Sequence, residues 1–193
     1  MKKLSLLLAA ALCVTIGGVY ATWNYAQKTA TSVESKLSAQ LELTADAEKG
    51  SIAVDANNLT LVIDDIGAAD YVAELVFSAS LSVSFTPAVG ADEVVAQQGV
   101  PLQITITENF GTYDHDGDGN ADFDLFYIGE EGQTSATFDL NGGAPVIGTI
   151  DVNLSDYIKM TALSLPTKSH YDRLNSLLNT EGNNFVITIS EKI

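Results

Sequence analysis

The chain is poor in the residues from which most redox and metal centres are built. Its 193 residues include one cysteine, Cys13, and two histidines, His115 and His170. A single cysteine cannot form an intramolecular disulfide, and two histidines disfavour a multi-histidine metal centre. The His-Glu-x-x-His pattern of zinc proteases, the Gly-x-Ser-x-Gly elbow of hydrolases and the Gly-x-Gly-x-x-Gly loop of dinucleotide-binding folds are all missing. We therefore expect no catalytic residues and a protein that is not an enzyme.

Positive charge is also scarce. There are 9 Lys+Arg against 25 Asp+Glu, which gives a formal net charge of −16. A surface this acidic repels nucleic-acid phosphates, and this excludes a nucleic-acid binder. The charge favours a soluble, self-repelling surface or one that collects cations. Because 46% of the residues are hydrophobic, we expect one domain with a sizeable core rather than a disordered chain.

The N-terminal apolar run is too short for an ordinary membrane anchor. It covers residues 4–16, after the pair Lys2-Lys3, whereas a membrane-spanning helix needs about 20 apolar residues. Its length and its cationic head are typical of a secretory signal peptide. We place cleavage after Ala21, so that residues 1–21 are the signal peptide and Cys13 is removed with it. We therefore expect a secreted protein that meets signal peptidase during export and the membrane only transiently.

The region around this junction carries a family resemblance. Residues 17–24 read Gly-Gly-Val-Tyr-Ala-Thr-Trp-Asn and resemble the cleavage region of TasA and camelysin-like proteins, which are Gram-positive exported proteins processed by the signal peptidase SipW. The resemblance implies a jelly-roll-like β-sandwich and, for some members, assembly into extracellular fibres of the biofilm matrix. The camelysin branch is described as metalloprotease-like. Here that activity would need zinc ligands assembled from His115, His170 and scattered carboxylates.

Beyond the signal, alternating apolar and polar residues predict a series of short β-strands. In the longest run, 71–87, large apolar residues alternate with small polar ones, which indicates a strand with one buried face. We expect this run to bend, or to pass from one sheet to another, near Ser80. Further strands are expected at 40–44, 58–64, 101–107, 123–128, 134–140, 146–153, 157–165 and 185–190. Many short strands separated by Gly/Asn/Asp clusters predict an all-β sandwich or barrel.

One helix is expected near the C-terminus. Apolar residues at three- and four-residue spacing, Tyr171, Leu174, Leu177 and Leu178, predict a helix over 167–180. Together with the resemblance, these patterns predict an all-β, jelly-roll-like β-sandwich with one short helix. The sandwich domain is expected at 46–193. Residues 22–45 are expected to be an N-terminal tail and a candidate donor strand.

The motif that carries chemistry is the Asp/Gly sequence at residues 113–124. It reads Tyr-Asp-His-Asp-Gly-Asp-Gly-Asn-Ala-Asp-Phe-Asp. Alternate side chains of a tightly wound loop converge on one point, and Ca²⁺ takes several oxygen ligands at once. The candidate Ca²⁺ ligands are Asp114, Asp116, Asp118, Asn120, Asp122 and Asp124.

This loop departs from an EF-hand, because Leu125 occupies the position of the final bidentate Glu and strands flank the loop. Its pattern instead resembles the calcium loops between β-strands in integrin-type propeller blades, which is a resemblance of a loop and not of a fold. Without a cation the aspartates would repel one another, so binding would order the turn. The alternative is a solvated acidic turn that binds nothing in particular. A structural ion fits better than a catalytic one, because every candidate ligand would coordinate the ion and none would be left to act as a nucleophile or base.

Three functions follow as hypotheses. The first is a structural protein of the cell surface or biofilm extracellular matrix that self-associates into fibres or joins other matrix proteins. Its mechanism would be donor-strand exchange, in which the N-terminal segment of one copy pairs with an open sheet edge of another. The second is a monomeric Ca²⁺-dependent adhesin or carbohydrate-binding sandwich, and the third is a camelysin-like metalloprotease. An N-terminal segment folded back into its own sheet would favour the second function, and an open groove or a detached N-terminal strand would favour the first. Whether His115 and His170 lie near each other bears on the third.

Overall fold

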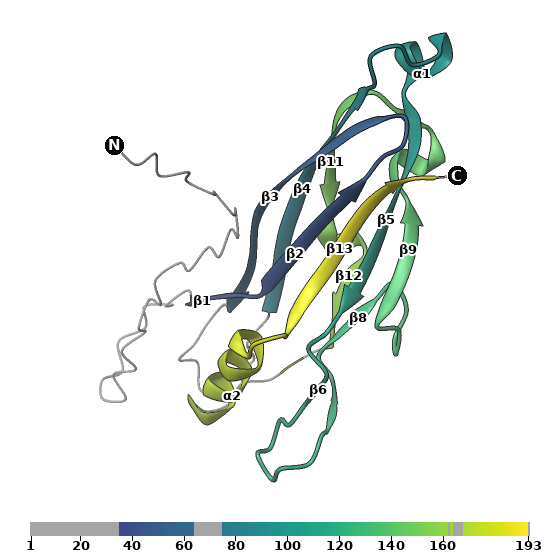
Figure 1. The fold of residues 1–193 in the computed structure, drawn as a ribbon. Helices are drawn as coiled ribbons and strands as arrows, with labels where there is room; N and C mark the ends of the chain where they lie inside the picture. The colour runs from purple at the N-terminus through teal and green to yellow at the C-terminus, as the bar shows by residue number, and fades with distance from the viewer. Residues whose placement is uncertain (1–34, 64–74, 162, 164–167, 193) are drawn as a thin grey trace, which may run out of the picture.

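The computed structural model describes residues 35–63, 75–161, 163 and 168–192. Strands dominate, in several sheets, with two short helices, α1 (Glu93–Gln98) and α2 (Lys168–Asn179) (Figure 1). The strands are β1 (Ser35–Ser38), β2 (Gln40–Asp46), β3 (Gly50–Ile63), β4 (Leu75–Pro87), β5 (Val100–Glu108), β6 (Thr112–Tyr113), β7 (Phe123–Asp124), β8 (Phe126–Ile128), β9 (Ser135–Asp139), β10 (Pro145–Val146), β11 (Gly148–Asn153), β12 (Ile158–Met160) and β13 (Asn184–Glu191). Two 3₁₀ turns cover Leu140–Gly143 and Leu154–Asp156. No helix in these ranges has the length and apolarity needed to cross a membrane.

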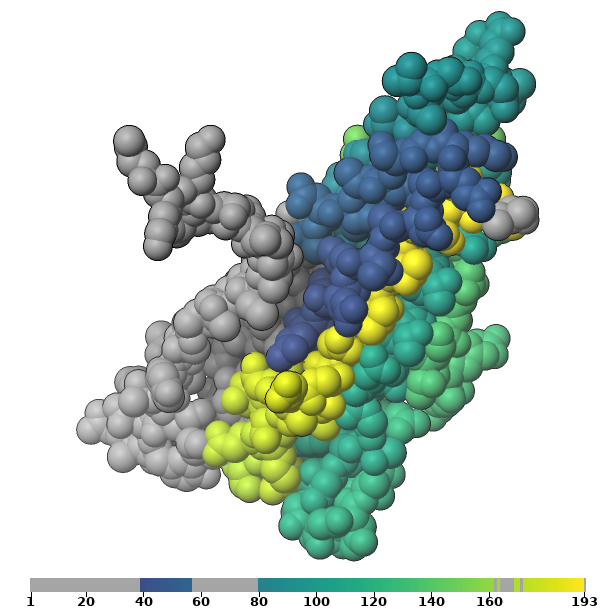
Figure 2. All heavy atoms as spheres, viewed as in Figure 1, coloured from purple at the N-terminus to yellow at the C-terminus, as the bar shows by residue number. Residues whose placement is uncertain are grey.

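Two larger sheets make up most of the fold. The first has the order β1-β3-β4-β11, and the second has the order β10-β5-β13-β2, with β9 also paired to β5. β2 runs parallel to β13, whereas β5 pairs with β13 in the antiparallel sense. Figure 2 shows the outer face of the second sheet, where β2, β13, β5 and β9 lie side by side. Two small ladders, β12-β8 and β6-β7, complete the pairing among the described residues.

The core lies between the two larger sheets, and its residues follow the strand period of two. In β5 and β13 every second side chain is buried, because one face of each strand meets the core. The fully buried side chains contributed by these two strands and by β4 include Leu81, Val83, Phe85, Leu102, Ile104, Ile106, Phe185, Ile187 and Ile189. The prediction of a mostly β fold with alternating core positions is therefore confirmed.

Several strand predictions are confirmed, and others need correction. The strands expected at 40–44, 101–107, 134–140 and 185–190 correspond to β2, β5, β9 and β13. The single strand expected at 123–128 is wrong, because the chain changes partners at buried Leu125: β7 pairs with β6, and β8 pairs with β12. The strand expected at 146–153 is also split, at Ile147, where the chain leaves β5 and joins β4. Alternation reports which face is buried but not which strand is the neighbour.

The irregularity expected near Ser80 lies in the opposite strand. β4 stays in one sheet along its described length, paired with β3, and the register shifts between Asn57 and Thr60 of β3. The part of that run before Leu75, at 71–74, lies outside the described residues. A bulge in β3 therefore accommodates the long ladder without a change of sheet.

The expectation of one helix is also wrong, because α1 is a second one. Asp92 caps it by accepting a hydrogen bond from the Val95 N–H at 2.9 Å. Gly99 ends it with φ +77°, and a Cβ at Gly99 would lie 1.7 Å from the Val146 carbonyl oxygen. A six-residue helix is too short to show periodicity, so the capping residues are its available signal. The C-terminal helix is confirmed as α2, with Leu174 and Leu178 buried.

The described end of the N-terminal tail is paired within its own chain. β1 pairs with β3 in the first sheet, and β2 pairs with β13 in the second. Ala39, between the two strands, is buried where the chain passes from one sheet to the other. The expected signal peptide, 1–21, and the rest of the tail, 22–34, lie outside the described residues.

Candidate metal-binding loop and the helix beside it

The Asp-rich segment forms the loop of a short hairpin at the end of the sandwich where α2 also lies (Figure 1). Thr112 and Tyr113 of β6 pair with Asp124 and Phe123 of β7. The Asp122 N–H closes the loop by donating to the Tyr113 carbonyl at 3.0 Å. The two-residue ladder therefore fixes both ends of the loop and leaves its carboxylates outside the sandwich.

Carboxylates and backbone amides hold the loop in its wound form. Asp114 accepts hydrogen bonds from the N–H groups of Gly117 at 2.6 Å and Gly119 at 3.0 Å. Both glycines have positive φ, +82° and +90°, which glycine adopts without a Cβ penalty. On the other side of the loop, Asp122 accepts from the His115 N–H at 2.7 Å. The Asp and Gly spacing in the sequence thus reflects a loop that wraps around its own side chains.

Three of the predicted ligands come together. Carboxylate oxygens of Asp114, Asp116 and Asp122 all lie within 4.8 Å of one another. Such an arrangement brings like charges close, which a hard cation with oxygen ligands would neutralise. The predicted ligand Asp124 lies in β7 and is not part of this group.

The other two predicted ligands bond to each other at the exposed tip. Asp118 accepts from the Asn120 backbone N–H at 2.7 Å and from its side-chain amide at 2.9 Å. These hydrogen bonds stabilise the charged carboxylate, so they lower the pKa of Asp118. Asp118 therefore stays ionised to lower pH than an ordinary aspartate.

Arg173 of α2 joins the helix to the loop. Its Nη2 donates to the His115 carbonyl, and its Nη1 donates to the Ser169 hydroxyl at 2.8 Å. A Cβ at Gly117 would lie 2.7 Å from the Arg173 Nη1, so the guanidinium rests directly against the loop. Sequence reasoning missed Arg173, because a single cation on a helix does not reveal which distant loop it will meet.

The two histidines meet in the same place. The rings of His115 and His170 are 4.6 Å apart between centroids, and the Tyr113 hydroxyl donates to the His170 carbonyl at 3.0 Å. Burial lowers the pKa of His170, and the neighbouring His115 and Arg173 lower it further. Burial raises the pKa of the Tyr113 hydroxyl, and Arg173 partly offsets this. Within the described ranges the group of mutually close ligands consists of the three aspartates, with neither histidine in it.

Two buried carboxylates were also missed. Glu108 is 6% exposed, and Glu191 is 9% exposed. They end the inward-facing rows of β5 and β13, so extending the apolar alternation by one more step would have found both. Glu108 accepts from the Phe110 N–H at 3.0 Å, and burial raises its pKa. Glu191 accepts from the Lys49 N–H at 2.7 Å.

Known proteins do not extend this description. No family model matches the chain, and neither a curated protein nor a solved structure matches it.

Proposed function

We propose that the chain is an exported structural protein of the cell surface or biofilm extracellular matrix, and that copies assemble into fibres by donor-strand exchange. The observation that carries this proposal is the position of β2. This N-terminal strand lies at the end of its sheet, pairs with β13, and has no fully buried side chain. A strand attached mainly by main-chain hydrogen bonds at a sheet edge is the kind of element that another copy can replace.

The finer architecture that we propose is a jelly-roll-like sandwich, as the resemblance to TasA implies. Two features support it. The chain passes between the sheets at Ala39, between β1 and β2, and again at Ile147, between β10 and β11. Such crossings join the edges of two sheets into one closed domain.

We also propose that the loop at residues 114–122 binds Ca²⁺ as a structural ion. The mutual approach of the Asp114, Asp116 and Asp122 carboxylates supports this. A divalent cation would neutralise their repulsion and stiffen the loop against Arg173 and α2. Because the formal net charge is −16, divalent cations would also reduce repulsion between copies.

The experiment is negative-stain electron microscopy of residues 22–193, concentrated with Ca²⁺ and, in parallel, with EDTA. Regular filaments support the matrix-subunit function, and their loss in EDTA links the Asp loop to assembly. An Asp114→Asn, Asp122→Asn double variant is the matched control for the loop, because it keeps size and hydrogen-bonding capacity while removing two charges. Monodisperse particles under all conditions would contradict spontaneous assembly.

The second candidate is a monomeric Ca²⁺-dependent adhesin or carbohydrate-binding sandwich. The pairing of β2 with β13 of the same chain favours it, because an N-terminal segment folded back into its own sheet is the arrangement expected of a monomer. Binding to immobilised polysaccharide by particles that stay monomeric would support it. The metalloprotease remains third. The ring centroids of His115 and His170 are 4.6 Å apart, and this motivates one test. Peptide cleavage with added Zn²⁺ that is abolished in His170→Asn would support the metalloprotease.

A further inference from the structure

β2 is an edge strand of the second sheet and is weakly embedded in it. Its side chains are all at least partly exposed, whereas alternate side chains of β5 and β13 are buried. Leu41 and Leu43 touch the core but are only partly buried. Loss of β2 would therefore uncover less apolar surface than loss of β5 or β13, and strands of this kind open locally at low free-energy cost.

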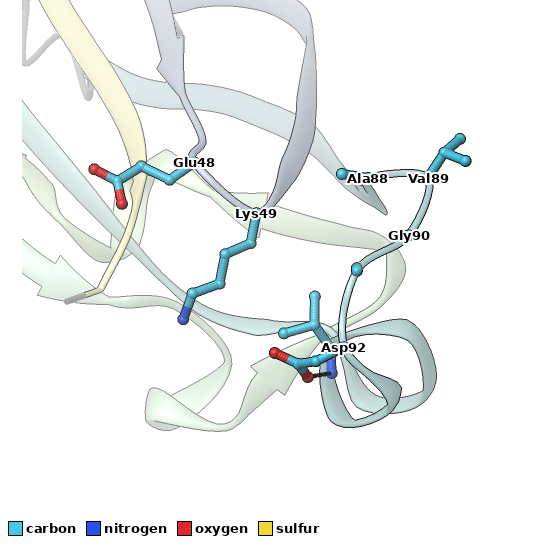
Figure 3. A pocket seen from close by; sticks show the side chains of 8 residues that line it. Glu48, Lys49, Ala88, Val89, Gly90 and Asp92 are labelled. Carbon is cyan, nitrogen blue, oxygen red and sulfur yellow. Dashed lines mark hydrogen bonds between the residues drawn. The ribbon is translucent and has the colours of Figure 1, made fainter.

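The turn that follows β2 is attached through the backbone of Lys49 by two hydrogen bonds, one to a side chain and one to the main chain. The Lys49 N–H donates to the Glu191 Oε1 at 2.7 Å, and the Lys49 carbonyl accepts from the Ala88 N–H at 2.9 Å. Beside the turn is a pocket of about 240 Å³, with Glu48 and Lys49 on one side and the loop from Ala88 to Asp92 on the other (Figure 3). This hollow leaves one side of the turn unpacked. The turn is held by the apolar contact of partly buried Ala47 with the core and by the two hydrogen bonds of Lys49.

Glu191 accepts the stronger of these two hydrogen bonds. It occupies the last inward position of β13 and is 9% exposed. A carboxylate forms stronger hydrogen bonds than a carbonyl does, and a buried carboxylate that loses a donor is costly. Release of the turn would therefore leave Glu191 short of a donor until water reached it, and this penalty favours the closed state.

We propose that β2 and the turn at residues 47–49 form a releasable strap, and that Glu191 is the latch that holds it closed. The strap opens as a local unit while the rest of the sandwich stays folded. Opening frees the edge of β13, at residues 184–190, for a strand from a second copy. This last consequence rests on the proposed fibre function; the latch itself does not.

The test is hydrogen–deuterium exchange of the full chain, comparing peptides from β2 with peptides from β5. In Glu191→Ala we expect exchange in β2 to rise about tenfold or more relative to β5, because a charged hydrogen bond is lost. Glu191→Gln keeps an acceptor at the same place and should restore most of the protection. If the alanine variant does not fold, Glu191→Gln takes its place in the test, and we then expect a smaller rise in exchange that is confined to β2.

Glu108→Ala is the matched control. Glu108 is also a buried glutamate at the end of an inward row, but its bond goes to Phe110, two residues away. Because Glu108 itself lies in β5, the comparison is made on β2 alone, and we expect Glu108→Ala to leave exchange in β2 unchanged. Equal acceleration of β2 by the Glu108 and Glu191 variants, or no acceleration by Glu191→Ala, overturns the latch.

Electron microscopy of the same samples separates the latch from the fibre. Faster β2 exchange in Glu191→Ala with no filaments in any sample supports the latch and counts against the fibre. Filaments formed by proteins whose β2 exchange does not depend on Glu191 support the fibre and overturn the latch.

Discussion

Glu108 and Glu191 invite comparison, because they are the same residue type in neighbouring strands at opposite ends of one core. In the antiparallel ladder of β5 and β13, Glu108 faces Phe185 and Glu191 faces Leu102. Glu108 bonds to the N–H of Phe110, two residues along the chain. Glu191 bonds to the N–H of Lys49, which is 142 residues away. One buried carboxylate therefore shapes its own loop, and the other joins the first part of the described chain to the last.

The largest effect is expected from removing the packing that surrounds Glu108. Phe185 is fully buried and its ring lies 4.7 Å from Phe110 and 5.0 Å from Phe126, between centroids. Phe185→Ala should lower the free energy of unfolding by about 3–5 kcal/mol. Ile189→Val, nearer to Glu191, is the control and should cost about 0.5–1.5 kcal/mol. Denaturant titration measures both, and a smaller loss for Phe185→Ala would show that the Glu108 end is not part of the stable core.

Substitution of two glycines with similar backbone angles tests the two ends of the core in another way. Gly99, at the α1 end, and Gly111, beside Glu108, have φ of +77° and +67°. A Cβ at Gly99 would clash with the backbone of Val146, whereas a Cβ at Gly111 would meet nothing within 4 Å. Gly99→Ala should therefore cost about 2–4 kcal/mol, and Gly111→Ala about 1–2 kcal/mol. Equal thermal shifts in the two variants would contradict the close contact at Gly99.

The pH dependence of stability should report on Glu108. Burial raises the pKa of Glu108 above its ordinary 4.5, so the folded state favours the protonated form. Stability from this group is full below pH 4.5 and is lost as the pH rises through the folded-state pKa. Glu108→Gln should remove that loss and be more stable than the wild type at pH 7. Unfolding titrations between pH 4 and pH 8 measure it, and parallel curves for the two proteins would contradict the raised pKa.

The smallest effect should come from the hydroxyl pairs on the outer face of the second sheet. The Thr44 and Thr188 hydroxyls are 2.7 Å apart, and those of Thr105 and Thr137 are 2.8 Å apart. Thr44→Val and Thr137→Val should each cost about 0.2–1 kcal/mol. Because Thr44 lies in the strap, only its substitution should also speed hydrogen exchange in β2. Acceleration of β2 by Thr137→Val would mean that β2 opens together with the sheet.

Much of the fold was predictable because alternation is a local property of the sequence. The rows through Ile104 and Ile187 indicated both the strands and their buried faces. The wound Asp loop between two strands was predictable for the same reason, since glycine and aspartate spacing acts within a few residues. Ca²⁺ binding there stays a prediction.

The remainder depends on contacts between distant parts of the chain. Nothing near Leu125 or Ile147 shows that the chain changes partners there, because pairing is decided by the neighbouring strand. The contact of Arg173 with His115 and the bond from Lys49 to Glu191 are of this kind. The alternating rows that end in Glu108 and Glu191 are visible in the sequence. Glutamate is rarely buried, however, so the alternation alone did not predict that these two side chains face the core.

The parallel pairing of β2 with β13 has a mechanical consequence. The first of these strands is near the N-terminus and the second ends near the C-terminus, and seven residue pairs join them, from Gln40 and Asn184 to Asp46 and Ser190. Tension applied between residues 40 and 191 would pull the two strands in opposite directions along their length. The load would then fall on the whole ladder at once, in shear, instead of opening it one bond at a time. A strand at the edge of a sheet can therefore still resist stretching along the chain.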